Sequence, residues 1–139
     1  MGGRRVRIVV VVTGEGGSGG ASAVGVGDVV RMLGHAIYSV IPPEGFAAIL
    51  YKHAAPEQVQ QAAAFLRLTA QDALELGVID EIIPEPLGGA HHDGIGMAAT
   101  LKQAIVRRLE PLLALPVDEL VDQRYAKFRA MGKWEVRRG

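Results

Sequence analysis

Five glycines within seven residues, at positions 14, 16, 17, 19 and 20, constrain this chain more than any other feature. They follow the apolar run 8–12 and precede the small-residue stretch 21–27. This order is typical of a buried strand, a glycine loop and the start of a tightly packed helix. Only Glu15 and Ser18 give the loop side chains. Its working groups are therefore expected to be backbone N–H donors that a ligand can approach closely.

The composition narrows the class of protein. With 139 residues, of which 49% are hydrophobic, the chain suffices for one modest domain with an apolar core. A formal net charge of zero argues against nucleic-acid binding through phosphate contacts. The absence of cysteine excludes disulfides and thiolate metal sites. No apolar run approaches the roughly 20 residues that cross a bilayer, and the run 8–12 is too short for a signal peptide. A cytoplasmic location is expected.

Strand and helix signals alternate along the chain, which predicts an α/β fold. Strands are expected at 8–12, 28–33, 36–41 and 78–83, and helices at 43–52, 56–66, 70–76, 95–113 and 116–131. Thr69 with Asp72 resembles a capping box, and Gly77 suits a helix stop. Pro111 is expected to kink its helix or end it early. The charged tail 133–139 is expected to fray.

One face of the penultimate helix is apolar: Leu101, Ile105, Leu109 and Leu112 recur at helical spacing. Such faces usually pack in a core. On a chain this short, part of the face is also available to a partner subunit.

The glycine loop matches two known motifs. Gly14-x-Gly16-x-x-Gly19 fits the dinucleotide-binding motif, but the acidic residue expected about 20 positions on is missing from residues 32–43. Gly16-x-Ser18-x-Gly20 fits the nucleophile elbow of serine hydrolases, with Asp80 and His91 following in the required order. An entire α/β-hydrolase, however, does not fit in this length.

A third interpretation is a backbone oxyanion hole. Adjacent N–H groups at a helix start point the same way and carry the partial positive charge of the helix, so they stabilise a developing anion without any side chain. A loop that is glycine-rich only for close strand–helix packing is the structural alternative.

Three stretches resemble the carboxyltransferase alpha subunit of bacterial acetyl-CoA carboxylase. They are Gly14 to Ala21 (GEGGSGGA), Tyr38 to Gly45 (YSVIPPEG) and Ile82 to His91 (IIPEPLGGAH); a weaker match is Gln123 to Phe128 (QRYAKF). The segment 68–83 is also similar to the helix–strand segment of the crotonase superfamily, whose members hold thioester enolates with paired backbone N–H groups. The resemblance implies a crotonase-like (ClpP/crotonase) α/β core followed by C-terminal helices, with residues 1–139 forming the C-terminal part of that domain.

The resemblance also implies a reaction. Such a subunit helps move the carboxyl group from carboxybiotin, carried on the biotin carboxyl carrier protein, to acetyl-CoA, which gives malonyl-CoA for fatty acid synthesis. ATP acts at the separate biotin carboxylase step. The implied partners are the carboxyltransferase beta subunit, the carrier protein and acetyl-CoA. No metal is expected in this chain, since any zinc would belong to the beta subunit.

Site residues follow from the resemblance position by position. The backbone N–H groups of Gly19 and Gly20 would hold the urea oxygen of biotin and act as the catalytic donors. The cofactor-binding residues would be Gly16, Gly17, Ser18, Pro43, Glu44 and Gly45. For the segment around Glu44, a helix start with a favourable acid at its positive end is an equal alternative.

Some features depart from the family. Its alpha subunits are roughly twice this long, residues 1–7 look unlike them, and His92 stands where they have arginine. The N-terminal half of the family domain is thus expected to be absent, or supplied by a separate chain. A noncatalytic remnant that binds other carboxylase subunits and another crotonase-type acyl-CoA enzyme are the alternative functions. The neighbours His91 and His92 are expected to diverge and not to bind a metal.

Overall fold

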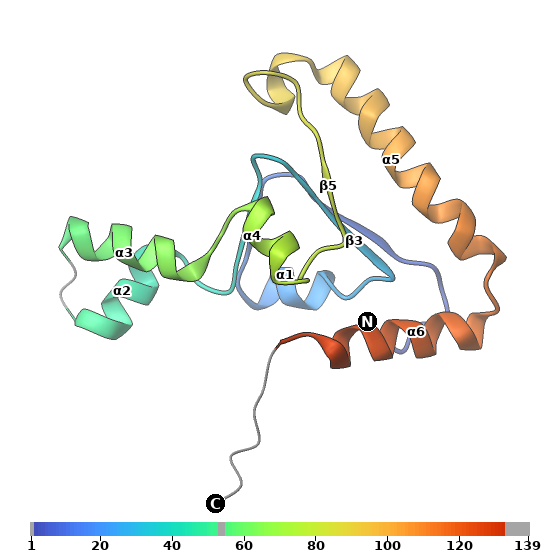
Figure 1. Cartoon of the computed structure of the whole chain (residues 1–139), viewed down its shortest axis with the longest axis horizontal. Helices are drawn as coiled ribbons and strands as arrows, with labels where there is room; N and C mark the ends of the chain where they lie inside the picture. The colour runs from blue at the N-terminus through green and yellow to red at the C-terminus, as the bar shows by residue number, and fades with distance from the viewer. Residues whose placement is uncertain (1, 53–54, 133–139) are drawn as a thin grey trace, which may run out of the picture.

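The computed structural model describes residues 2–52 and 55–132 as strands and helices that alternate along the chain (Figure 1). In chain order these are β1 (Val9–Val12), β2 (Glu15–Gly17), α1 (Ser18–Val24), β3 (Val29–Leu33), β4 (Ile37–Ser39), α2 (Pro43–Tyr51), α3 (Pro56–Leu66), α4 (Ala70–Glu75), β5 (Glu81–Ile83), the short 3-10 helix η1 (Ala90–His92), α5 (Gly94–Ala114) and α6 (Val117–Ala130). The predicted α/β class is confirmed. The tail 133–139 lies outside the described residues.

The strands form two small parallel sheets. One has the order β1-β3-β5, with Val11 beside Arg31 and Arg31 beside Glu81. The other pairs β2 with β4 and sets Gly16 beside Tyr38. Parallel strands need long crossovers between them, and the helices of this chain provide these connections.

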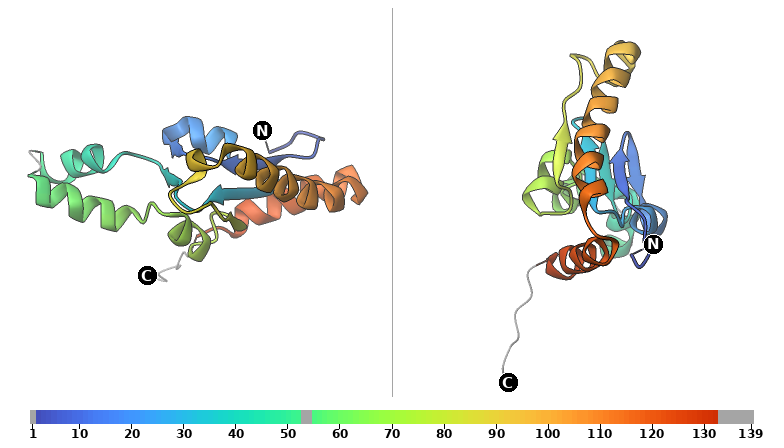
Figure 2. Two further views of the ribbon diagram at one scale, coloured as in Figure 1. Left: turned by 90° about the horizontal axis from the view of Figure 1, so that it is seen from above. Right: turned by 90° about the vertical axis from the view of Figure 1, so that its right-hand side faces the viewer.

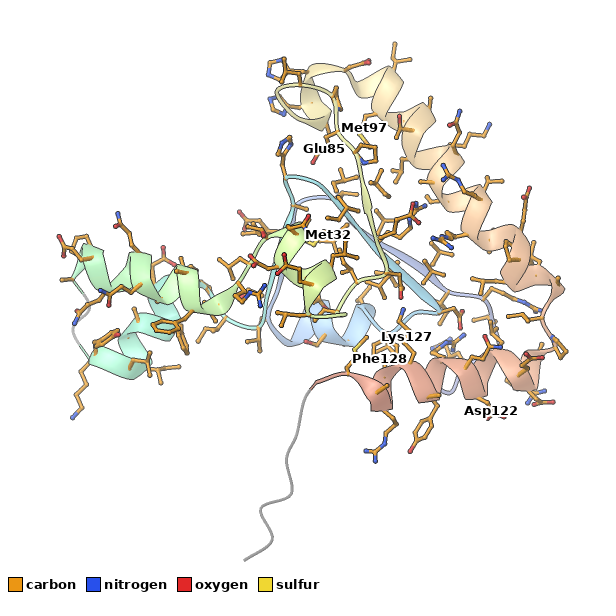
Figure 3. The ribbon with its side chains drawn as sticks, viewed as in Figure 1. Met32, Glu85, Met97, Asp122, Lys127 and Phe128 are labelled. Carbon is orange, nitrogen blue, oxygen red and sulfur yellow. The ribbon has the colours of Figure 1, made fainter. Side chains whose placement is uncertain are left out.

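The apolar core lies on both faces of β3, whose Val30, Met32 and Leu33 are all buried. Small residues of two helices close over it, with Ala73 on α4 and Ala104 on α5. Figure 3 shows Met32 at the centre of the molecule. A central strand buried on both faces explains why its sequence is a nearly continuous apolar run.

Helix α6 is fastened to the start of β3 by a buried ion pair. The Arg124 guanidinium donates to both carboxylate oxygens of Asp28, at 2.8 and 2.9 Å, and the two side chains are 1% and 4% exposed. Arg124 also donates to the backbone carbonyls of Gly2, Arg4 and Val6. Asp28 in turn accepts the N–H of Ile8 at 2.6 Å. One ion pair therefore joins the N-terminal segment, the sheet and α6.

A second contact joins α6 to the start of β5. The Lys127 ammonium pairs with Asp80, and Asp80 also accepts the N–H of Val30 at 2.7 Å. In Figure 3 Lys127 points from α6 toward the sheet. The two aspartates thus hold α6 across the N-terminal ends of neighbouring strands.

The expectation that Pro111 ends its helix early is wrong, because α5 continues to Ala114. A proline inside a helix removes the hydrogen bond from its own nitrogen and crowds the carbonyl four residues earlier, and here both effects fall near the end of α5, where they do not stop the helix. The backbone carbonyls at the end of α5, which have no partner within the helix, accept hydrogen bonds from Arg7. Its guanidinium donates to Leu112 at 3.2 Å and to Leu115 at 2.8 Å.

Several predicted boundaries are shifted. Helix α1 begins at Ser18, three residues before the expected start, and Gly25 ends it. The last strand is shorter than the range 78–83, because β5 covers only Glu81–Ile83. The predicted cap of α4 is confirmed: Thr69 Oγ1 accepts the N–H of Asp72 at 3.2 Å.

Helices α2 and α3 pack against each other and project away from the sheets (Figures 1 and 2). Several of their large apolar side chains are exposed, including Ile49 at 71% and Phe65 at 73%. We call this pair of helices the α2–α3 arm. Of the helices in the described ranges, none is long and apolar enough to span a membrane.

The buried ion pair gives the first prediction. Replacing Arg124 by methionine should lower the free energy of unfolding by about 3–5 kcal/mol, because Asp28 would remain buried without its counter-charge. Urea denaturation followed by circular dichroism measures this loss. Asp118→Asn is the matched control, since it removes the exposed ion pair between Arg5 and Asp118 and should change stability little. Equal effects of the two substitutions would contradict a dominant role for the buried pair.

Candidate functional site

A cavity of about 330 Å³ lies between the glycine loop and the start of α2. Three predicted site residues of the loop line it, namely Gly16, Gly17 and Ser18, and Pro43 and Glu44 line it from α2. The structure thus brings together two segments that are more than 20 residues apart in sequence. The remaining lining residues are Glu15, Ile37, Ser39, Ile41, Pro42 and Leu68.

The predicted donors Gly19 and Gly20 lie in the first turn of α1, directly after the part of the loop that lines the cavity. Both residues are exposed, and neither belongs to the cavity lining itself. The N–H groups of a first helical turn have no acceptor within the helix. The N-cap residue Gly17 provides no side-chain acceptor either.

Ser18 is strained. Its φ is +61°, in the left-handed region that non-glycine residues seldom adopt. It stands where α1 begins directly after strand β2, with no residue between the two elements. Beyond it, a Cβ built on Gly19 or Gly20 would meet nothing within 4 Å. The start of α1 is therefore open to an approaching ligand.

The opposite wall is held by a local turn. The hydroxyl of Ser39 donates to the carbonyl of Ile41 at 2.6 Å and accepts the N–H of Ile41 at 3.3 Å. Helix α2 starts two residues later, with Pro43 in its first turn and Glu44 at its positive end, as the sequence predicts. Gly45 packs against Ile41 and lies outside the cavity lining.

Sequence reasoning missed Tyr38. Its ring lies against Gly16, where a Cβ would be 2.5 Å from Cδ2 of the ring. Its hydroxyl donates to the carbonyl of Ala21 at 3.2 Å, and burial raises the pKa of the phenol. A glycine paired with an aromatic residue on a neighbouring strand would have indicated this contact. That pairing can be recognised only when the register of β2 and β4 is known.

The hydrolase arrangement does not form. Asp80 lies at the start of β5 and pairs with Lys127, whereas His91 lies on η1, beyond the other end of that strand. Ser18 belongs to the other sheet region, at the start of α1. The three residues of the suggested triad therefore sit on separate parts of the fold.

His91 and His92 do not diverge as expected, because their ring centroids are 4.4 Å apart. Both rings pack on the glycine turn before η1, His92 on Gly88 and His91 on Gly89. Within residues 2–52 and 55–132, no three histidine or carboxylate side chains are arranged to hold a metal ion.

Below this turn, Glu85 ties two loops together (Figure 3). Its buried carboxylate accepts the N–H of His35 at 2.6 Å and the N–H of Ala90 at 2.9 Å, and it lies 3.2 Å from Nδ1 of His35. Burial alone would raise the pKa of Glu85. The two N–H donors and His35 outweigh it and leave the pKa below its usual value.

Fold and site together define an α/β protein in which a glycine loop opens a helix beside a ligand-sized cavity. The family model for acetyl co-enzyme A carboxylase carboxyltransferase-like proteins matches residues 1–132. The chain belongs to this family.

Curated relatives agree with this assignment. The chain is 57% identical over 129 residues to the acetyl-coenzyme A carboxylase carboxyl transferase subunit alpha of Geobacter sulfurreducens, covering 93% of this chain and 40% of that protein. It is 51% identical over 130 residues to the subunit of the same name from a Synechococcus species, covering 94% and 39%. The chain thus spans about two fifths of the length of these relatives.

Among solved structures, the enoyl-CoA hydratase of Thermoplasma volcanium is similar over 90% of this chain and 54% of its own chain. The TM-score is 0.39 and the sequence identity 17%.

Glu85 gives a prediction for pH. Because its pKa in the folded protein is lowered, its stabilising contribution is fully present above the carboxyl's ordinary pKa near 4.5 and is lost as the pH falls through the folded value. Glu85→Gln should cost about 1–3 kcal/mol at pH 7, because the amide cannot accept both N–H groups through oxygen. Urea titrations between pH 3 and 7 measure both effects. The loss of stability caused by Glu85→Gln should become smaller toward pH 3. A loss that is the same at every pH would contradict stabilisation by the ionised carboxylate of Glu85.

Proposed function

We propose that this chain provides the biotin side of a carboxyltransferase that moves a carboxyl group from carboxybiotin to acetyl-CoA. The observation that carries the proposal is the glycine loop that lines a cavity and then opens α1, in a chain of this family. The activity for which the relatives are named supports the same proposal. The proposed fold of the catalytic domain is crotonase-like, and the proposed setting is the cytoplasmic synthesis of malonyl-CoA for fatty acids.

The cavity suits a bicyclic ring of the size of biotin. Its walls combine apolar side chains, Ile37, Ile41 and Leu68, with the nearly bare backbone of the glycine loop. When bound, carboxybiotin would supply the carboxyl group, and negative charge would develop on its urea oxygen. Backbone donors fit this chemistry, because a fixed N–H stabilises developing charge without the reorganisation that a flexible side chain needs.

Each part of the site has a proposed task. The N–H groups of Gly19 and Gly20 would donate to the urea oxygen, with the positive end of α1 behind them. Gly16, Gly17 and Ser18 would let the ring approach the backbone. Pro43 and Glu44 would complete the opposite wall, and Gly45, behind them in the first turn of α2, would support it through Ile41.

The proposed partners follow from the same reaction. A beta subunit would hold acetyl-CoA, and a biotinylated carrier protein would deliver the carboxyl group. The chain spans about two fifths of its relatives, and the proposed activity is that of an assembly in which this segment would supply the biotin side of the site.

The test is Gly20→Pro, which removes one donor. Malonyl-CoA formation should fall about 100-fold or more, because losing one such donor costs that much in comparable enzymes. The assay uses the full chain co-expressed with a beta subunit and a biotinylated carrier. A second preparation is a chimera in which this chain replaces the 129 matched residues of the Geobacter sulfurreducens subunit.

Gly20→Ala is the matched control. It keeps the N–H, and a Cβ at this position meets nothing within 4 Å. It should lose at least tenfold less activity than Gly20→Pro. Near-normal turnover of a folded, assembled Gly20→Pro variant would rule out the donor role. Turnover that does not depend on biotin would instead favour a different acyl-CoA reaction.

A further inference from the structure

Helix α1 is poorly anchored by packing. None of its seven residues is buried, and Val24 is 58% exposed. Between α1 and β1 lies a second cavity of about 300 Å³, lined in part by Ala21, Gly25 and Tyr38. A helix without a buried face gains little orientation from the hydrophobic effect, so its position depends on the few specific contacts that it makes.

Tyr38 makes such a contact at the C-terminal turn of α1. Its hydroxyl donates to the carbonyl of Ala21. A Cβ on Gly25, the C-cap residue, would lie 2.7 Å from the same hydroxyl oxygen, so the hydroxyl lies directly against the helix cap. Ala21 also accepts the N–H of Gly25 at 2.7 Å, and the tyrosine therefore joins a turn that is already hydrogen-bonded.

The ring of Tyr38 fixes where this hydroxyl stands. Gly16 and Tyr38 are paired across β2 and β4, and the bare glycine leaves room for the ring. The backbone N–H of Tyr38 donates to the carbonyl of Leu68 at 3.0 Å, which holds β4 from its other side. Tyr38 is thus tied to the sheet through its backbone and to α1 through its hydroxyl.

We propose that Tyr38 is a positioning residue that sets the orientation of α1, and that Gly16 is a glycine because the tyrosine ring occupies the space of its side chain. A tyrosine hydroxyl is ordinarily protonated, and so able to donate, throughout the neutral range, and burial raises the pKa of Tyr38 further. Through α1, Tyr38 determines where the N–H groups of Gly19 and Gly20 point; this last step rests on the proposed function.

A double-mutant cycle tests the contact in the full chain, without any activity assay. Gly16→Ala alone should raise the unfolding equilibrium constant at least tenfold, because the new Cβ meets the ring. In a Tyr38→Ala background the same change should have less than about a threefold effect. Gly14→Ala is the matched control, since a Cβ there meets nothing within 4 Å. Equal effects of Gly16→Ala in both backgrounds would overturn the proposal.

Tyr38→Phe separates the hydroxyl from the ring. The ring contact is kept, so the far-ultraviolet spectrum and the melting temperature should change little. Amide hydrogen exchange should rise about fivefold to tenfold in α1 and stay unchanged in α4, because only α1 loses a tether. Tyr125→Phe, at an exposed tyrosine on α6, is the control. Unchanged exchange in α1 would contradict the tether.

The same variant tests the link to catalysis in the complex with the beta subunit and the biotinylated carrier. With Tyr38→Phe, kcat should fall about tenfold while KM for acetyl-CoA stays constant, because the proposed role concerns the biotin side alone. An unchanged kcat would overturn the positioning role. If the unmodified complex forms no malonyl-CoA at all, the proposed function fails, and the cycle and the exchange rates still decide whether Tyr38 positions α1.

Discussion

The buried pair of Asp28 and Arg124 is the interaction on which the architecture depends. The carboxylate of Asp28, directly before β3, accepts the N–H of Ile8, which precedes β1. It also accepts hydrogen bonds from the guanidinium of Arg124 on α6. The Arg124 guanidinium also donates hydrogen bonds to three backbone carbonyls of the N-terminal segment. A buried pair of this kind is costly to desolvate, and its value lies in fixing one arrangement of its neighbours. Together with the pair of Lys127 and Asp80, it holds α6 across the N-terminal ends of the strands.

The cavity depends only indirectly on the elements that the Asp28–Arg124 pair joins. The three-stranded sheet carries the core, whereas the glycine loop and β4 form a separate two-stranded sheet beside it. The site is therefore built from short elements that hydrogen bonds hold in place: the Ser39 turn on one wall and the Tyr38 hydroxyl on the other. A stable core beside a lightly packed site suits catalysis, because catalytic groups must be held in a defined orientation and need not themselves be buried.

Local signals predicted much of this fold. The apolar run before the loop, the Thr69 cap and the prolines at helix starts all lie where the sequence places them, since each acts within one turn. Long-range contacts could not be predicted. The sequence does not reveal that Arg7 donates to carbonyls at the end of α5, more than 100 residues away, or that α5 continues past Pro111. The sequence also does not predict that Arg31, inside the apolar strand β3, is buried and paired with Glu81. The glycine loop was recognised, but its partner Tyr38 depends on strand register.

The α2–α3 arm has a consequence for the cavity. Its two helices pack chiefly on each other, and its root, from Pro42 to Glu44, is one wall of the cavity. Such a unit can open at a lower free energy than the whole domain, because opening it leaves the central sheet intact. Because Pro42 to Glu44 belong to both structures, local opening of the arm would disturb that wall of the cavity before the core unfolds.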